Sequence, residues 1–396
     1  MIRSVQGPAL NRLYAIAVCQ GLAIAALSSL IPAYLHHQGA SDFLVGLSFT
    51  FWALTRGVFG LVSGTAFRRF GPRTVLTTAM AIFAVATAGF ALSRSPWTLV
   101  DFRLLQGVAA GLYWTALLAA VAHASPPERR LAALARTNII ALAMGLIGQP
   151  IAGEMARALS PTSYYWISTA ILSLVALPLA ATLPQSRTED VPVEPRSTQT
   201  VAHLAPIQRW QTVLAALGNL PAVVTSVGMP IIFADRGVGY AGIGVEGGLM
   251  LFAGMLLQQM GQGWGRRFGR GRLLVLSGTC CAAALVGIAA HLPLPLTAAS
   301  FVILFGSLAL ANLTWLHWSQ SGVPDGLLGP LTGFFRGVGD LSSVITFSLF
   351  GVLAAHLTLG LSFLAVVVFG VGLSALRLEG RINAERPSST GAVATR

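Results

Sequence analysis

Arg68-Arg69-Phe70-Gly71 lies between two long apolar runs, and the same four residue types recur as Arg266-Arg267-Phe268-Gly269, again between two such runs. The second copy follows the first at half the length of the 396-residue chain. A loop repeated at this offset indicates that the chain is built from two similar halves.

The composition places most of the chain in a lipid environment. Hydrophobic residues make up 55% of the sequence and charged residues only 10%, whereas a soluble domain carries roughly 25% charged residues. All 25 basic residues are arginines, and the formal net charge is +12. Most of these arginines form short clusters between the apolar runs. This is the pattern of cytoplasmic loops in membrane proteins, and it does not indicate a nucleic-acid-binding surface.

The apolar runs define the expected fold, because about 20 helical residues are needed to cross a bilayer. We expect an all-α membrane protein with twelve transmembrane helices in two pseudo-symmetric six-helix bundles. Residues 1–184 form the N-terminal bundle, 185–209 a polar cytoplasmic linker, and 210–396 the C-terminal bundle with a short cytoplasmic tail. The expected helices are 13–35, 44–66, 75–92, 97–122, 138–156, 164–183, 210–233, 240–264, 273–290, 297–318, 331–355 and 357–376.

The distribution of arginines predicts the orientation. With the N-terminus inside, only Arg94, Arg157 and Arg236 of the assigned arginines fall outside, so both termini are expected in the cytoplasm. The first apolar run is too long for the core of a signal peptide, and we expect it to be retained as a helix. All three cysteines lie within apolar runs, which argues against a disulfide framework. The predicted location is the bacterial cytoplasmic (inner) membrane.

Two sequence segments resemble signatures of the major facilitator superfamily. Residues 64–73 are similar to the family's loop between helices 2 and 3, although Arg68 stands where the family usually has Asp. Leu99-x-x-x-Arg103-x-x-Gln106-Gly107 resembles helix 4 of the proton-coupled drug and metabolite exporters of this superfamily. In those exporters an intramembrane Arg is linked to proton transfer, which the resemblance implies for Arg103.

A third segment, 145–153, is similar to the Gly/Pro signature of helix 5 in exporters of the same superfamily. Gln149 stands where a Gly is usual, and Glu154 replaces the second Gly of the closing pair. Small residues allow helices to approach closely, and Pro permits a bend. From these three segments we expect conformational gating to involve Gly64, Arg69, Gly71, Arg73, Gln106, Gly107, Gly148, Pro150 and Gly153.

Ionisable residues inside the apolar runs are candidates for a functional site, because each must face a cavity or a partner. Arg56 and Arg103 lie within the second and fourth runs, and Arg336 and Asp340 lie one helical turn apart, where they can pair. Glu246 has no basic neighbour in its own helix, so burial should favour its neutral form. We expect Glu246 to carry protons, with Asp340, Glu154 and Arg103 as further candidates.

Several intramembrane arginines against few carboxylates imply a positive cavity, which favours an anionic substrate such as a carboxylate or phosphate. We expect Arg56, Arg103 and Arg336 to contact the substrate. Aromatic side chains in transmembrane helices more often serve packing or interface belts. Those that could line the same cavity are Trp52, Tyr113, Trp114, Trp315 and Trp318.

These observations predict a secondary active transporter without a cofactor or metal. The leading hypothesis is a proton-coupled antiporter that exports a small, anionic organic molecule by alternating access, such as a carboxylate siderophore-like metabolite or a drug. A proton-coupled uptake symporter for organic anions remains open, and so does a membrane-embedded enzyme. The expected partners are a small-molecule substrate, protons and the lipid bilayer, with no nucleic acid, and the protein is expected to be a monomer.

One pattern resembles an enzyme motif. His37-x-x-x-x-Asp42 has the spacing of an acyltransferase acid/base pair, but it falls in a short loop beside His36 without a companion motif. We therefore interpret it as a solvated loop. The chain has no Lys, so it has no nucleotide-binding loop of the Walker type and ATP-driven transport is not expected.

Overall fold

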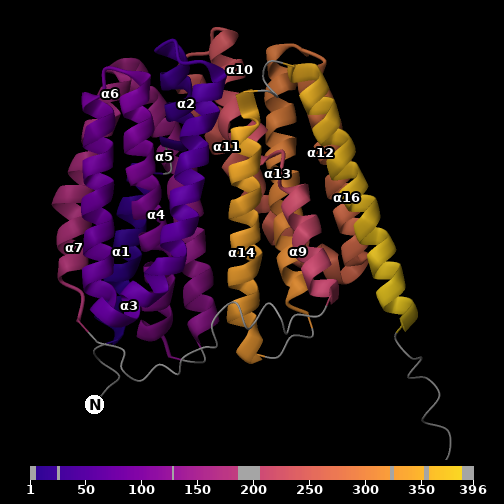
Figure 1. The fold of residues 1–396 in the computed structure, drawn as a ribbon, viewed down its shortest axis with the longest axis horizontal. Coiled ribbons are helices and arrows are strands. Elements are labelled where there is room, and N and C mark those ends of the chain that lie inside the picture. Colours follow the sequence, from indigo (N-terminus) through magenta and orange to yellow (C-terminus); the bar gives the residue numbers. More distant parts are fainter. Residues whose placement is uncertain are drawn as a thin grey trace, which may run out of the picture. The chain divides into compact units, whose positions relative to one another are not determined.

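The computed structural model of the chain describes residues 6–24, 27–126, 129–185, 206–321, 325–351 and 356–385. Within these residues the regular secondary structure is entirely helical, which confirms the expected all-α fold (Figure 1). Nine of the described helical segments are long and apolar enough to cross a membrane. Val224–Asp235 is a shorter apolar helix of the same kind. The chain is thus a multi-pass membrane protein.

The helices of the first half correspond to the first six predicted spans. The first span is described in two segments on either side of residues 25 and 26, the sixth comprises three consecutive segments, and one continuous element holds the second and third. The segments are α1 (Gln6–Ile24), α2 (Leu27–His37), α3 (Asp42–Leu92), α4 (Pro96–Ala124), α5 (Arg130–Ala158), α6 (Pro161–Ala170), the π-helix η3 (Ile171–Ala176) and α7 (Leu177–Ala181).

The helices of the second half correspond to the remaining six spans. The seventh span is broken by a turn at residues 219–221 and then contains a π-helical stretch, whereas the eighth, ninth, tenth and twelfth spans are single helices among the described residues. The segments are α9 (Pro206–Gly218), η4 (Val224–Gly228), α10 (Met229–Asp235), α11 (Tyr240–Phe268), α12 (Arg270–Ala289), α13 (Leu294–Ser319), α14 (Asp325–Ser348) and α16 (Leu357–Glu385).

The repeated loop adopts a similar backbone turn in both halves. The 51 residues of α3 would extend about 76 Å as one helix, more than twice the roughly 30 Å of a bilayer core. Gly71 interrupts α3 with φ 78° and ψ 167°, and Gly269 separates α11 from α12 with φ 87° and ψ 151°. L-residues rarely adopt these angles, so the glycine of the repeat ends one span and lets the chain return.

Tertiary contacts divide the chain into two compact units. The first comprises Met1–Arg196, Pro221–Ala253 and Gly339–Leu357, and the second Ser197–Leu220, Gly254–Val338 and Thr358–Arg396. The first unit therefore includes parts of α11 and α14 from the second half of the sequence. The division into bundles at 1–184 and 210–396 stays a prediction, and most of the linker, 186–205, lies outside the described residues.

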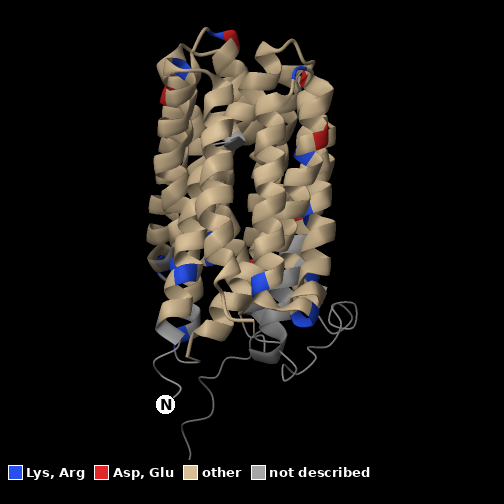
Figure 2. Cartoon of the chain, turned by 90° about the vertical axis from the view of Figure 1, so that its left-hand side faces the viewer, with Lys and Arg blue, Asp and Glu red and all other residues tan. Residues whose placement is uncertain are grey.

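Charged residues lie mainly toward the ends of the helices. Figure 2 shows long uncharged stretches between the blue and red positions on the side that it presents. This distribution fits helices whose central turns face lipid or other helices. The charged side chains that remain in the central turns are thus few, and they are the ones considered below as a functional site.

In the first unit, α3 and α4 are packed closely. Gly107 and Gly111 form a small-xxx-small pair on α4, and a methyl group added at Gly107 would lie 2.5 Å from the carbonyl oxygen of Trp52. One added at Gly111 would lie 2.5 Å from the carbonyl oxygen of Arg56. Only glycine permits this approach. The backbone of α4 therefore lies directly against the turn of α3 that carries Trp52 and Arg56.

In the second unit, two tryptophans form part of the core, and a carboxylate ties α16 to α12. Trp315 and Trp318 are stacked, with ring centroids 5.4 Å apart, and both are buried. Glu379 of α16 accepts hydrogen bonds from the backbone N–H groups of Arg270 and Gly271, each at 2.9 Å. These N–H groups belong to the first turn of α12, where backbone N–H groups have no hydrogen-bond acceptor within the helix.

Candidate functional site

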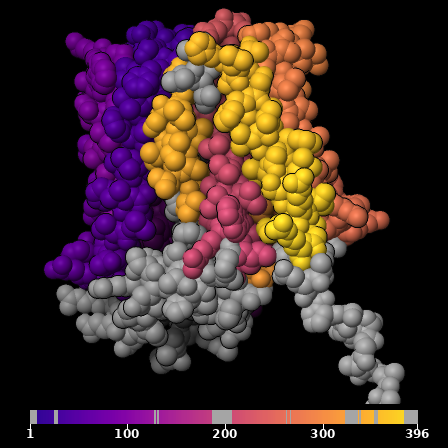
Figure 3. Space-filling model, turned by 45° about the vertical axis from the view of Figure 1, so that its right-hand side comes forward, coloured from indigo at the N-terminus to yellow at the C-terminus, as the bar shows by residue number. Residues whose placement is uncertain are grey.

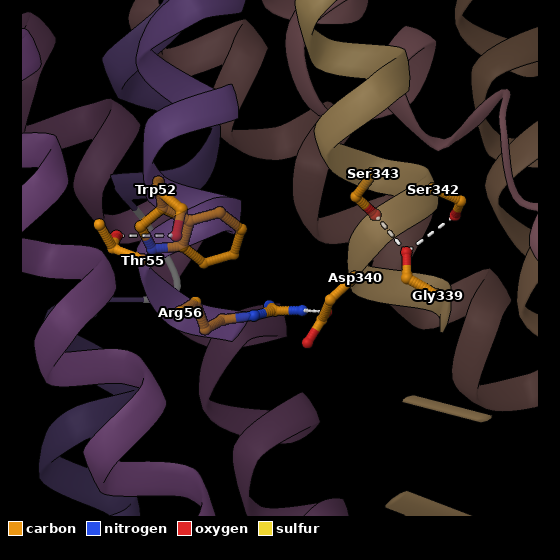
Figure 4. Close-up of polar contacts among 7 residues, drawn as sticks. All are labelled: Trp52, Thr55, Arg56, Gly339, Asp340, Ser342 and Ser343. Atoms are coloured by element: carbon orange, nitrogen blue, oxygen red, sulfur yellow. Dashed lines mark hydrogen bonds and ion pairs between the residues drawn. The ribbon is translucent and has the colours of Figure 1, made fainter. Parts of the chain in front are cut away.

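An ion pair joins α3 to α14 within the first unit. The guanidinium of Arg56 contacts the carboxylate of Asp340, and Figure 4 shows the Arg56 side chain extending from α3 toward Asp340 on α14. The side chains are 32% and 26% exposed. A solute that enters between these helices could therefore reach both charges, whereas it could not reach a fully buried ion pair.

Close packing of α3 against α14 brings the two charges within reach. A methyl group added at Gly46 of α3 would lie 2.7 Å from the carbonyl oxygen of Phe347. One added at Gly351, just after α14, would lie 2.7 Å from Cα of Phe43. Figure 3 shows the light-orange spheres of α14 against indigo spheres from the beginning of the chain. In the next turn of α14, the hydroxyls of Ser342 and Ser343 donate to the carbonyl oxygen of Gly339 (Figure 4).

The indole of Trp52 contacts two guanidinium groups. The guanidinium carbon of Arg56 lies 4.6 Å from the ring centroid of Trp52, and that of Arg103 lies 5.1 Å from it. A cation within about 6 Å of an aromatic ring is attracted by its quadrupole. Trp52 therefore links the partly exposed Arg56 to the deeper Arg103.

Arg103 is sealed between α3 and α4. Its residue exposure is 4%, its guanidinium lies 4.2 Å from the ring centroid of Phe49, and it donates a hydrogen bond to the side-chain oxygen of Gln106. Among the described residues no carboxylate lies within ion-pair distance of Arg103, and its Nε has no hydrogen-bond partner there. Inserting an Arg at the centre of a membrane helix costs about 2.5–3.5 kcal/mol, and the aromatic faces and Gln106 offset part of this cost.

Glu246 is also sealed, on α11. Its residue exposure is 4%, and its Oε1 has no hydrogen-bond partner among the described residues. The same stretch of α11 packs on the Gly/Pro segment of α5: a methyl group added at Gly244 would lie 3.0 Å from Cα of Gly153, and one at Gly248 would lie 2.9 Å from Cγ of Pro150. Glu246 thus lies beside a tight helix crossing in the first unit.

Gln149 fills the space at this crossing. Its side-chain oxygen accepts a hydrogen bond of 3.1 Å from the hydroxyl of Ser29, and it occupies the space where a side chain on Gly247 would lie. The residue that departs from the exporter signature is therefore part of the contact between α5 and α11.

The other predicted proton-coupling and substrate residues lie elsewhere. Glu154 pairs with Arg157 one turn away on α5, and the two side chains are 54% and 61% exposed. The side chain of Arg336 lies outside the described residues. Tyr113 is buried in the core of the first unit, 6.1 Å from Phe83 between ring centroids, and Trp114 packs against that core. Trp315 and Trp318 lie in the core of the second unit.

The predicted gating residues fall into three places. Gln106 and Gly107 lie at the contact of α4 with α3, and Pro150 and Gly153 at the contact of α5 with α11. Gly148 is buried on α5. The loop positions are Gly71 at the turn, with exposed Arg69 and Arg73 beside it and Gly64 one to two turns earlier.

Sequence reasoning missed two contacts. The structure pairs Asp340 with Arg56, 284 residues away, which the spacing did not suggest. The pairing of Asp340 with Arg336 stays a prediction, because the side chain of Arg336 lies outside the described residues. Sequence reasoning also missed the hydrogen bond between His36 and Asp235. No local pattern links residues so far apart, although the presence of single charges on different apolar runs signals that partners are needed.

Comparisons with known proteins identify the family. The model of the Major Facilitator Superfamily matches residues 13–347. The chain belongs to the major facilitator superfamily. An uncharacterised MFS-type transporter of Yersinia pseudotuberculosis serotype O:3 (strain YPIII) is 26% identical over 260 residues, which cover 64% of this chain and 65% of the relative. One of Mycobacterium tuberculosis is 26% identical over 172 residues, or 42% of this chain and 30% of the relative.

Solved structures share the superfamily fold at low sequence identity. A D-xylose-proton symporter has a TM-score of 0.74 with 16% identity, covering 93% of this chain and 97% of its own. A POT family transporter in complex with 5-aminolevulinic acid has a TM-score of 0.76 with 10% identity, covering 95% and 96%. At these identities the likeness concerns the fold, which confirms the predicted major facilitator architecture.

Proposed function

We propose that this major facilitator protein is a secondary transporter that exports a small organic anion in exchange for protons. The observation that carries the proposal is the Arg56–Asp340 pair, in which a positive and a negative side chain from different halves of the sequence meet while both are partly exposed. Helices that must separate during alternating access can exchange such a pair for contacts to a solute.

The balance of charges supports an anionic solute. Asp340 neutralises Arg56, whereas Arg103 lacks a carboxylate partner among the described residues and shares Trp52 with Arg56. The cluster of Trp52, Arg56, Arg103 and Asp340 therefore has one excess positive charge. A carboxylate or phosphate group that approaches Trp52 and Arg56 would be attracted by that charge, and a guanidinium can bind it in a bidentate manner.

Proton coupling is assigned to Glu246, with Asp340 as the second candidate carboxylate in the same unit. Glu246 is sealed without a hydrogen bond to Oε1 in the described part of the chain, and a carboxyl group in that setting is most stable when neutral. Opening the contact between α5 and α11 would expose it to water and allow it to ionise. Export is proposed from the resemblance of residues 145–153 to the exporter signature, and Pro150 and Gly153 of this segment pack on α11.

Uptake of an anion together with a proton is the second candidate, because the same ion pair is also compatible with binding both together. Protonation of Asp340 would release Arg56 for an anion, so that proton and anion would bind together. In an exchanger the two would instead compete. The effect of pH on anion binding therefore separates the two candidates.

The test uses purified protein in liposomes. Organic anions, carboxylate siderophores and cationic drugs are screened for stabilisation, and each hit is measured for counterflow and for flux driven by a pH gradient of either direction. We expect anions to bind, Arg56→Gln to abolish binding, and Glu246→Gln to abolish pH-driven flux while counterflow persists. Glu154→Gln is the matched control, because Glu154 lies in an exposed pair, and it should transport normally.

Three outcomes would contradict the proposal. Stabilisation by cations alone would show that the arginines are structural. Anion binding that tightens as the pH falls would support co-transport over exchange. Absence of counterflow for every solute, with Glu246→Gln indistinguishable from wild type, would argue against transport altogether.

A further inference from the structure

The His36-His37 pair at the end of α2 is the sequence pattern that the proposed transport site does not use. An acid/base pair of the acyltransferase kind would require His37 to contact Asp42. In the structure the ring of His37 instead lies edge-on to the ring of Tyr240, with centroids 5.3 Å apart, and His36 is the residue next to Asp42.

His36 lies between carboxylates from two other helices. Its Nε2 is 2.8 Å from Oδ1 of Asp235, at the end of α10, and its Nδ1 is 3.8 Å from Oδ1 of Asp42, at the start of α3. Asp42 and Asp235 are close enough to interact electrostatically. The three residues join α2, α3 and α10 within the first unit, and α2 and α10 are side by side in Figure 1.

The two protonation states of His36 fit this arrangement differently. A carboxylate only accepts hydrogen bonds, so the 2.8 Å contact requires a proton on Nε2. In a neutral ring Nδ1 then has only a lone pair, which faces the Asp42 carboxylate, and Nδ1 is buried with no hydrogen-bond partner in the described residues. A second proton on Nδ1 would turn this contact into an attraction and place a positive charge between two negative ones.

We propose that protonated His36 bridges Asp42 and Asp235 and so holds α2 and α3 against α10, at the helix ends that are predicted to face outward. We call these three residues the His36 clasp. Protonation of His36 holds these helices together, and its loss leaves Asp42 and Asp235 to repel each other, so that the contact opens more readily. A histidine changes charge between about pH 5 and 8. The closed arrangement is therefore favoured at low external pH and loses this contribution as the pH rises.

Other charged and titratable groups lie around the clasp. His37 is on the same helix and Tyr240 begins α11. Arg236 directly follows the last residue of α10, and its side chain or backbone takes part in a further interaction. His37 lies on Tyr240 and makes no carboxylate contact in the described residues, so it provides a control for a histidine that changes charge at the same end without bridging helices.

The test measures the separation of the helices and needs no knowledge of the transported solute. Cys19, Cys280 and Cys281 are replaced by alanine, and spin labels are attached at Gln38→Cys and Gly239→Cys, since a side chain at Gly239 would meet no described atom within 4 Å. Distances between the labels are measured in lipid nanodiscs from pH 5 to 8, in this background and with His36→Gln, Asp235→Asn or His37→Gln.

We expect the short-distance population to dominate at pH 5 and the ratio of long to short distances to rise about two- to five-fold by pH 8, the range for a partly exposed ion pair. His36→Gln and Asp235→Asn should remove this dependence, and His37→Gln should retain it. An unchanged ratio across the pH range, or a dependence that survives in His36→Gln, would overturn the clasp. Because flux is not the readout, failure of the clasp and failure of the proposed exchange are distinguishable.

Discussion

A Gly107→Ala substitution should force α4 away from α3 and lower the thermal stability of the protein. The added methyl group would lie 2.5 Å from the carbonyl oxygen of Trp52 and 3.1 Å from its Cα. Ordinary contact requires the helices to separate by roughly 1 Å, which a close-packed interior resists. Overpacking of this kind costs about 1–3 kcal/mol. At about 2 °C for each kcal/mol in a large protein, the melting temperature should fall by about 2–6 °C.

The assay is thermal unfolding in detergent, followed by tryptophan fluorescence. Gly57→Ala on α3 is the matched control, because a methyl group there would meet no described atom within 4 Å. The melting temperature of Gly57→Ala should equal or exceed that of wild type, since alanine favours a helix by about 0.5–1 kcal/mol over glycine. Two results would refute this reasoning: a Gly107→Ala melting temperature equal to that of wild type, or a Gly57→Ala melting temperature that falls by the same amount. Either would show that the close contact of α3 with α4 does not hold Trp52 and Arg103 in place.

Three further predictions concern the capping carboxylate, the shared indole and the repeated turn. Glu379→Gln should lower stability by about 1–3 kcal/mol, because one of the two acceptor oxygens becomes an NH2 group that faces a backbone N–H donor. Thermal unfolding with exposed Arg377→Gln as control would show this, and equal melting temperatures would refute it. Trp52→Ala should weaken binding of the anion found in the liposome screen about two- to five-fold through loss of cation–π attraction, whereas Trp52→Tyr should retain most affinity in the same binding titration. Gly71→Ala and Gly269→Ala should each cost about 1–3 kcal/mol, because both glycines combine a positive φ with an extended ψ, a region that is essentially restricted to glycine. Chemical or thermal unfolding of the two variants can measure this, and a loss in one repeat alone would contradict a shared turn.

The fold was largely predictable because its determinants are local. A run of about 20 apolar residues must form a helix in lipid, where backbone groups have no other partners. The repeated Arg-Arg-Phe-Gly loop predicted the duplication, and the positive φ of Gly71 and Gly269 gives that repeat a physical reason. The all-helical architecture and the superfamily were both confirmed.

The site was only partly predictable, because its contacts join distant parts of the sequence. The pattern identified Arg56, Arg103, Asp340 and Glu246 as intramembrane charges, but helical spacing could not tell which helix brings Asp340 its partner. Glu154 could have been judged differently, since Arg157 follows three residues later and i,i+3 pairs are neighbours on a helix surface. The assignment of these residues to substrate and proton binding stays a prediction.

The capping role of Glu379 has a consequence for biosynthesis. The carboxylate that satisfies the first turn of α12 is 109 residues downstream of Arg270, so it leaves the ribosome long after that helix has entered the membrane. At about 5–20 residues per second the delay is roughly 5 to 20 seconds. During that interval the backbone N–H groups of Arg270 and Gly271 depend on water or lipid headgroups, and the turn acquires its protein acceptor only when α16 has been made.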